Sequence, residues 1–268
     1  MRDDFRVLSR GPGDGPWDLP RLQQRFAEGG FNGLNIRFIH PAAFKSLDFL
    51  LGLEGLQYLE VTGRIRNDVA AFQLPELREL SLATRSPRPV PGFASSSLTF
   101  LGIDDRDGKD HIAALEGIQE LAIWLWKGQN LAFLDDAELP LTTLRLEGRK
   151  QVAALDGIAG CRKLVEVQVR EARIESLEPL SGLTALRSVR VLPGPTKGEA
   201  CLDLSHLTGL QGLEELHLVR AGAIRSLRPL LDLPALRDVR LRDTEILDGD
   251  LSPLTALSAR ATVVRPDE

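Results

Sequence analysis

A short apolar pattern recurs along most of the chain and limits its possible folds more than any other feature. The pattern is an apolar residue, two variable residues, a second apolar residue, one variable residue and a third apolar residue. Nine clear copies have middle residues 20 to 27 positions apart, namely Leu59, Leu80, Leu101, Leu121, Leu144, Val167, Val189, Leu216 and Val239. A looser copy precedes them at Phe31, Leu34 and Ile36. Such near-constant spacing predicts a stack of similar units rather than one irregular core.

Each repeat is predicted to contain one strand and one short return arm. The apolar residues at the end of the pattern alternate, as expected of a strand with one buried face. The stretch before it has an apolar residue at every third position, as in Ile174, Leu177, Leu180 and Leu183, which favours a 3₁₀ or irregular turn. One unit cannot bury its own leucines, so neighbouring units must stack and pair their strands as a parallel sheet. The expected fold class is α/β, with about ten strands.

These features resemble the leucine-rich repeat family, in the short internalin-like or phosphatase-regulator-like subclass. The period of about 22 residues with the pattern x-x-P-L-x-x-L-x-x-L is clearest in residues 176–189 and 226–239. The resemblance covers about residues 31–257. It implies a leucine-rich repeat solenoid with a curved parallel sheet, a concave face that binds proteins, and a bacterial protein that stands alone.

The chain departs from this family at one position of the repeat. The family places Asn, or sometimes Cys, three residues after the last strand leucine, where the amide ties adjacent turns together. The residues at this position here are Arg64, Arg85, Arg106, Trp126, Arg149, Ala172, Gly194, Ala221 and Thr244. Either the turn takes another path, or the early repeats are irregular. Residues 83–97 and 104–111 also fit the repeat poorly and are expected to form irregular loops. Trp126 is expected to lie in the core.

Both ends of the repeat array have sequences that can close it. Residues 1–30 are predicted to form a lead-in, which includes the glycine-rich and proline-rich segment 11–16, and a helical cap over about residues 19–28. Asp18 is the expected N-cap, Pro20 lies in the first turn, Gly29 fits the C-terminal end, and Leu22 and Phe26 share one face. The solenoid is assigned to residues 31–257. Residues 258–268 are assigned to a final degenerate strand, within 259–264, and a polar tail.

Composition and charge favour a soluble cytoplasmic protein. Lys and Arg number 33 and Asp and Glu number 38, giving a net charge of −5, which disfavours general nucleic-acid binding. The charged N-terminus does not resemble a signal peptide, and no run of about 18 apolar residues could span a membrane. The two cysteines, Cys161 and Cys201, replace core positions of the repeat and are expected to be buried thiols.

No sequence motif indicates an enzyme. The glycine-rich segment lacks the Lys-Ser or Lys-Thr of a phosphate-binding loop, and no nucleophile elbow or zinc-protease motif occurs. None of the four histidines has a second ligand at metal-binding spacing. The segment DDRDGKD lacks carboxylates at the first and last positions of a calcium loop, which would be Ile103 and Ala114. We therefore expect no catalytic residue, cofactor or metal.

The outward residues of the strands form three rows that cross the predicted sheet. The first row is acidic toward the C-terminal half, whereas the second and third carry arginines there. This sorting predicts ion pairs between strands, which could simply keep the sheet soluble. The alternative is an interaction surface, because exposed Trp, Tyr and Arg dominate binding hot spots. The predicted partner-binding residues are Tyr58, Phe100, Trp124, Arg145, Arg170, Arg190, His217, Arg240 and Arg242.

The favoured function is a non-enzymatic scaffold that binds another protein, acidic or of mixed charge, on the concave face. The second hypothesis is a ligand-binding or nucleic-acid-binding module that uses the arginine rows.

Overall fold

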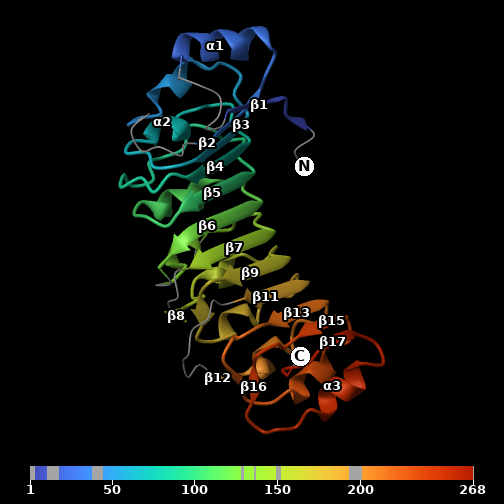
Figure 1. Cartoon of the computed structure of the whole chain (residues 1–268). Coiled ribbons are helices and arrows are strands. Elements are labelled where there is room, and N and C mark those ends of the chain that lie inside the picture. Colours follow the sequence, from blue (N-terminus) through green and yellow to red (C-terminus); the bar gives the residue numbers. More distant parts are fainter. Residues whose placement is uncertain are drawn as a thin grey trace. The chain divides into compact units, whose positions relative to one another are not determined.

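The computed structural model describes residues 4–10, 18–37, 45–127, 130–135, 137–148, 152–192 and 201–267. They fall into two compact units, Met1–Trp124 and Leu125–Glu268, which we call the N-terminal and C-terminal units. In each unit the long strands follow one another in chain order as a parallel sheet (Figure 1). No helix of the described residues is long and apolar enough to cross a membrane.

The sheet of the N-terminal unit is built from repeat strands in matching register. Its strands are β1 (Val7–Arg10), β2 (Gly33–Arg37), β3 (Tyr58–Thr62), β4 (Glu79–Ala83), β5 (Phe100–Asp104) and β6 (Glu120–Trp126). The last two residues of β6 belong to the C-terminal unit. Leu34, Leu59, Leu80, Leu101 and Leu121 lie side by side on successive strands, and all are buried. The helices of this unit are α1 (Leu19–Glu28), α2 (Val69–Phe72), η2 (Asp48–Gly52) and η3 (Lys109–Ala114).

The C-terminal unit repeats the same plan. Its main sheet contains β7 (Thr143–Gly148), β9 (Glu166–Arg170), β11 (Ser188–Leu192), β13 (Glu215–Leu218), β15 (Asp238–Arg240) and β17 (Thr262–Val264). Two small parallel sheets join the return arms: β8 (Val152–Ala153) with β10 (Arg173–Ile174), and β12 (Cys201–Leu202) with β14 (Ala223–Ile224) and β16 (Glu245–Ile246). The arms themselves contain η4 (Ala132–Leu134), η5 (Ile158–Gly160), η6 (Glu178–Leu180), η7 (Leu204–Leu207), η8 (Arg228–Asp232) and α3 (Ser252–Leu257).

The predicted repeat unit is confirmed in both of its parts. All ten strands expected from the apolar pattern are present, and short 3₁₀ turns precede seven of them, namely β3, β6, β7, β9, β11, β13 and β15. In one such arm, Leu177, Leu180, Leu183 and Leu186 are fully buried. A 3₁₀ turn brings every third residue to the same side, so these leucines fill the space between the sheet and the arms.

Several of the described turns that follow strands take another path in place of the missing Asn. In the C-terminal unit, Leu125, Glu171, Arg220 and Asp243 have φ between 54° and 56°, in the left-handed region. The residue that follows each of them is Trp126, Ala172, Ala221 or Thr244, and each is buried. Backbone hydrogen bonds then tie adjacent turns, such as Glu171 N–H to the Leu192 carbonyl at 3.1 Å. The predicted core position of Trp126 is confirmed, while Arg149 and Gly194 lie outside the described residues.

The predicted helical cap is confirmed, and the structure adds a strand in front of it. The helix α1 begins after Asp18, whose side chain accepts a hydrogen bond from the Arg21 N–H, and it buries Leu22 and Phe26. The strand β1, which the sequence did not reveal, pairs with β2 and extends the sheet at its first edge. At the other end, β17 confirms the expected final strand. The first predicted loop, 83–97, is irregular from residue 84 onward, whereas η3 occupies part of the second predicted loop, 104–111.

Candidate functional site

The open face of the C-terminal sheet carries two adjacent rows of polar side chains. The strand register places the residues of the first row beside one another, namely Thr143, Glu166, Ser188, Glu215 and Asp238. The second row lies two residues further along each strand and contains Arg145, Gln168, Arg190, His217 and Arg240. Alternate strand residues point to opposite sides of a sheet, so both rows face away from the leucine core.

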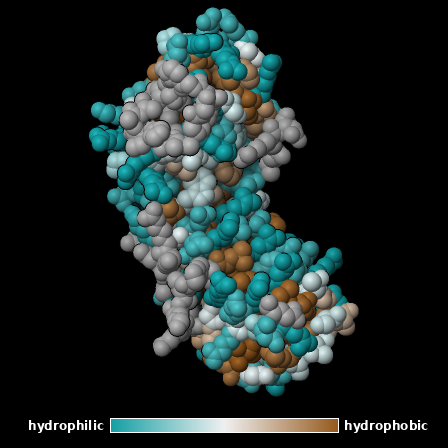
Figure 2. Space-filling view, in the orientation of Figure 1, coloured by the Kyte–Doolittle hydropathy of each residue, from teal (hydrophilic) through white to brown (hydrophobic). Residues whose placement is uncertain are grey.

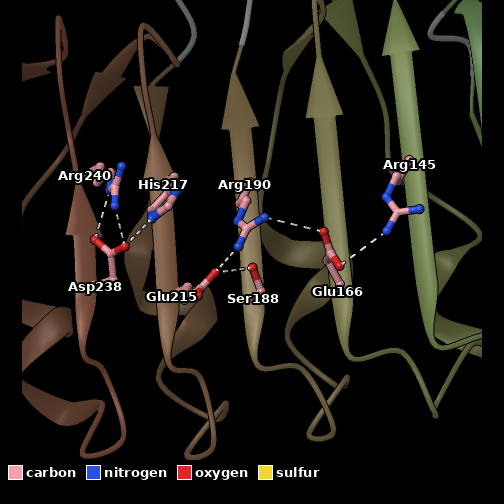
Figure 3. A network of polar contacts seen from close by, with 8 residues as sticks. All are labelled: Arg145, Glu166, Ser188, Arg190, Glu215, His217, Asp238 and Arg240. Atoms are coloured by element: carbon pink, nitrogen blue, oxygen red, sulfur yellow. Dashed lines mark hydrogen bonds and ion pairs between the residues drawn. The ribbon is translucent and has the colours of Figure 1, made fainter. Parts of the chain in front are cut away.

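Ion pairs and hydrogen bonds connect the two rows in two clusters, one that joins β7, β9, β11 and β13 and one that joins β13 and β15 (Figure 3). Arg190 is the central residue, because its guanidinium pairs with Glu215 on the next strand and lies 3.7 Å from Glu166 on the previous one. Glu166 is also 3.8 Å from Arg145. Ser188 donates a hydrogen bond of 3.0 Å to Glu215. The predicted ion pairs between strands are therefore confirmed.

A second cluster continues the network on β13 and β15. Arg240 donates two hydrogen bonds to the carboxylate of Asp238, at 3.1 and 3.0 Å. The Nε2 atom of His217 lies 3.0 Å from an oxygen of the same carboxylate. His217 is only 9% exposed, so the prediction that it presents an accessible contact is wrong. The side chain lies on the outward side of the strand, but its neighbours cover it.

The network favours the ionised form of two of its carboxylates, those of Glu215 and Asp238. Burial pushes the pKa of Glu215 upward, but hydrogen bonds from Arg190 and Ser188 outweigh burial and hold this pKa below its usual value. The pKa of Asp238 is also lowered, because contacts with Arg240 and His217 outweigh its partial burial. The hydrogen bonds to Asp238 raise the pKa of Arg240. The charged groups of these two rows are thus largely neutralised by one another.

The third row of the C-terminal sheet face differs from the first two. It lies at the carboxyl ends of the strands and contains Glu147, Arg170, Leu192, Val219 and Arg242. Arg170 and Arg242 are exposed. Neither forms an ion pair or a side-chain hydrogen bond with any residue that the structure describes. Of the predicted arginines, these two are therefore available to a partner, whereas Arg145, Arg190 and Arg240 are already engaged with carboxylates.

The three predicted aromatic contacts all lie in the N-terminal unit, and one of them is covered. Tyr58 is only 4% exposed, because the ring of Phe5 packs against it with centroids 5.4 Å apart. Its hydroxyl donates a hydrogen bond of 2.6 Å to Glu60. The prediction of Tyr58 as an exposed contact is therefore wrong. Phe100 and Trp124 are partly exposed on the sheet face, as expected.

The ring of Trp124 packs over a glycine on the neighbouring strand. A Cβ atom added to Gly102, on the neighbouring strand, would lie 2.5 Å from the far edge of the Trp124 ring. Only glycine leaves room for this position. The arrangement fixes a large aromatic surface on the face of the N-terminal unit while part of the ring remains accessible.

A buried ion pair in the N-terminal unit was missed by sequence reasoning. Asp68 is fully buried, accepts hydrogen bonds from Arg106 at 2.9 and 3.0 Å, and accepts another from Thr84 at 2.6 Å. The guanidinium of Arg106 also lies over the ring of Phe72, 5.3 Å from its centroid. Arg106 occupies a position where leucine-rich repeat proteins usually have Asn. The missing Asn was therefore a signal in the sequence that another interaction stabilises this turn. This cluster stabilises the repeat and does not face solvent.

The two cysteines differ in their surroundings. Cys161 is fully buried as predicted, and burial raises the pKa of its thiol to about 11. Cys201 is exposed at the start of β12, so the prediction that it is a buried core residue is wrong. Both are free thiols.

Among the residues that the structure describes, no group of three or more His, Cys, Asp or Glu side chains could hold a metal ion.

The surface around these features is mainly hydrophilic. Figure 2 shows hydrophilic residues over much of the described surface on the side that it presents, with hydrophobic residues in separate smaller areas. Among the residues that the structure describes, the exposed large hydrophobic ones are Leu51, Val165, Leu231 and Leu247, and none of these belongs to the three rows. A charged surface with scattered apolar residues fits polar recognition better than a hydrophobic interface.

Comparison with known proteins identifies the fold. The sequence matches no family model and has no significant match among curated proteins. An internalin, InlF of Listeria monocytogenes, is 17% identical, with a TM-score of 0.53 over 86% of this chain and 71% of the internalin. The plant peptide hormone receptor RGFR1, solved in complex with RGF2, is 14% identical, with a TM-score of 0.56 over 90% of this chain and 38% of the receptor chain. The chain therefore has the leucine-rich repeat fold.

Proposed function

We propose that the protein is a non-enzymatic scaffold that binds a protein partner on the open face of its sheet. The observation that carries this proposal is the ordered network on the C-terminal sheet, which leaves two exposed arginines, Arg170 and Arg242, at its border. A partner that carries carboxylates could pair with these two arginines, because the network does not neutralise them.

The network also lowers the cost of binding. Long charged side chains lose rotamer freedom when a partner immobilises them, at roughly 0.5–1.5 kcal/mol each. Arg190 and Arg240 are already held by carboxylates on their own face, so a partner meets a surface whose side chains are largely fixed. Trp124 is similarly held against Gly102 on the face of the N-terminal unit. Arg and Trp are residue types that dominate interface hot spots.

The fold supports the same proposal by analogy. The plant receptor that shares this fold is a peptide hormone receptor, and its structure contains the bound RGF2. At 14% identity the similarity extends to the fold and not to the contacts. It supports a parallel sheet as a binding platform, while the partner of this chain must be argued from its own residues.

A nucleic-acid partner is less well supported than a protein. Phosphate backbones are bound by surfaces with a strong excess of positive charge. On the C-terminal sheet, Arg145, Arg190 and Arg240 lie beside Glu166, Glu215 and Asp238, so the first two rows carry no such excess.

We place the scaffold in the cytoplasm as part of the proposal, since both cysteines are free thiols. Fractionation of cells that produce the full chain would test this placement.

Cross-linking from chosen positions tests the binding face. A photoreactive amino acid at Gln168, in the middle of the second row, should cross-link a specific protein in cells that produce the chain. The control position is Leu231, which is 47% exposed on the arm η8. The proposal predicts a cross-linked protein from Gln168 and none from Leu231. Cross-linking of the same protein from Leu231 alone would show that the arms, and not the sheet, form the interface.

A further inference from the structure

We infer that the third row of the C-terminal sheet recognises an extended acidic segment of the partner, with two carboxylates four residues apart and an apolar residue midway between them. This inference rests on the proposed function and adds the chemistry and spacing of what is bound. It uses four residues that follow one another across the sheet: Arg170 and Leu192 end β9 and β11, whereas Val219 and Arg242 lie just beyond the ends of β13 and β15. We call these four residues the arginine clamp.

Backbone hydrogen bonds fix the order of the clamp residues across the sheet. Leu192 lies directly beside Arg170 in the register of β9 and β11. The Val219 N–H donates to the carbonyl of Val191 at 3.0 Å, which places Val219 beside Leu192. The Arg220 N–H donates to the carbonyl of Arg242 at 2.9 Å, which places Arg242 beside Val219. Two arginines therefore flank two apolar residues in one line.

The charges at the two ends of the clamp are unbalanced. Arg170 and Arg242 have no ion-pair partner among the described residues, whereas the arginines of the second row are paired. Glu147 is the acidic residue of the third row and forms no ion pair within the described part of the chain. The third row thus carries two positive charges and one negative charge, a net charge of 2 − 1 = +1. A partner with two carboxylates would complement its two ends.

The spacing of the clamp matches an extended peptide. Neighbouring strands lie about 4.8 Å apart, so three steps separate Arg170 from Arg242 by roughly 14 Å. An extended chain rises about 3.4 Å per residue, so residues four apart are separated by roughly 14 Å and point to the same side. The residue midway between them then lies over the boundary of Leu192 and Val219. A segment of the form acidic-x-apolar-x-acidic fits all four residues together.

Synthetic peptides can test both the chemistry and the spacing. The matched probe is the acetylated and amidated peptide Ser-Glu-Thr-Leu-Thr-Glu-Ser, whose ends carry no charge and whose sequence reads the same in both directions. The mis-spaced probe, Ser-Glu-Glu-Leu-Thr-Thr-Ser, has the same composition. Threonine favours the extended conformation in both. Each peptide carries a fluorescent dye, and fluorescence anisotropy with the full-length protein measures its affinity at low and at physiological salt.

The clamp predicts a clear order of affinities. The matched peptide should bind at least ten-fold more tightly than the mis-spaced one, and its affinity should fall as salt rises. Arg170→Ala and Arg242→Ala should each weaken binding of the matched peptide about ten-fold, the loss expected for one charge-assisted hydrogen bond. Arg162→Ala and Arg237→Ala are matched controls, because both arginines are exposed, unpaired within the described residues and absent from the three rows. They should leave affinity unchanged.

Charge exchange keeps the test informative if a variant folds poorly. The double variant Arg170→Glu, Arg242→Glu should lose the matched peptide and bind Ser-Lys-Thr-Leu-Thr-Lys-Ser with an affinity within ten-fold of the original pair. Equal affinity for matched and mis-spaced peptides, equal losses in the control variants, or no binding of the matched peptide at about 1 mM would overturn the clamp. Cross-linking from Gln168 that persists in any of these cases would show that the sheet-face interface stands and only its assigned ligand is wrong.

Discussion

Arg106 reaches across 38 residues of sequence to place its Nη1 atom 3.0 and 2.9 Å from the two carboxylate oxygens of Asp68. Both side chains are buried, with 7% and 1% of their surface exposed. Thr84 donates a third hydrogen bond to the same carboxylate. In this repeat, therefore, the charged side chain of Arg106 connects turns that leucine-rich repeat proteins usually connect through the amide of an Asn side chain.

Removing one member of this pair should strongly destabilise the protein. Asp68→Ala leaves a buried guanidinium without its counter-charge and should lower the free energy of unfolding by about 3–5 kcal/mol. Urea denaturation measures the loss. The matched control is Arg220→Ala, which breaks a half-exposed pair with Asp243 and should cost at most about 1 kcal/mol. Equal losses in the two variants would contradict a structural role for the buried pair.

The network on the C-terminal sheet should make stability depend on acid pH. The lowered pKa of Glu215 means that its contribution is complete above the ordinary value of 4.5 and is lost as pH falls through the lower folded value. Glu215→Gln should therefore be less stable than the wild type at pH 6, by at most about 1 kcal/mol, with the difference shrinking toward pH 3. Thermal denaturation at several pH values measures it. Ser188→Ala removes one donor and should show a smaller difference with the same trend, whereas a difference independent of pH would contradict this account.

The two cysteines should react differently with thiol reagents. At pH 8 an aromatic disulfide reagent should modify one thiol per folded chain, the exposed Cys201. Cys161 should stay unmodified, because it is buried and its pKa is raised to about 11. Cys201→Ser should abolish the reaction of the folded protein, and denaturant should reveal the second thiol. Modification of both thiols at one rate in the folded protein would contradict this assignment.

A side chain at Gly102 should displace Trp124. Gly102→Val places carbon atoms where the ring edge lies, so the indole should move toward solvent and its fluorescence emission should shift to longer wavelength. The stability loss should be about 1–3 kcal/mol, as for other overpacked positions. Gly182→Ala is the control, since a Cβ there meets nothing within 4 Å. An unchanged spectrum in Gly102→Val would show that the ring does not rest on this glycine.

The sequence predicted most of the fold and only part of the candidate site. The repeat strands, the N-terminal helix and the last strand could be predicted because each depends on local spacing of apolar residues or on a capping residue such as Asp18. The strand β1 was missed because four residues with two apolar side chains give no periodic signal. Cys201 was misplaced because its position depended on an inserted segment whose alignment the repeat pattern does not fix.

The sequence by itself determined which residues of each strand face the core, because a strand with one solvent-exposed face must alternate apolar and polar residues along its length. It could not determine which outward residues remain available. Tyr58 and Arg170 occupy similar outward positions, yet Phe5 covers Tyr58 whereas Arg170 stays exposed. Arg190 and Arg242 are both outward arginines, yet only Arg190 is held by carboxylates of two neighbouring strands. Only the tertiary structure decided these differences, because pairing and coverage depend on residues that are distant in sequence and adjacent across the sheet.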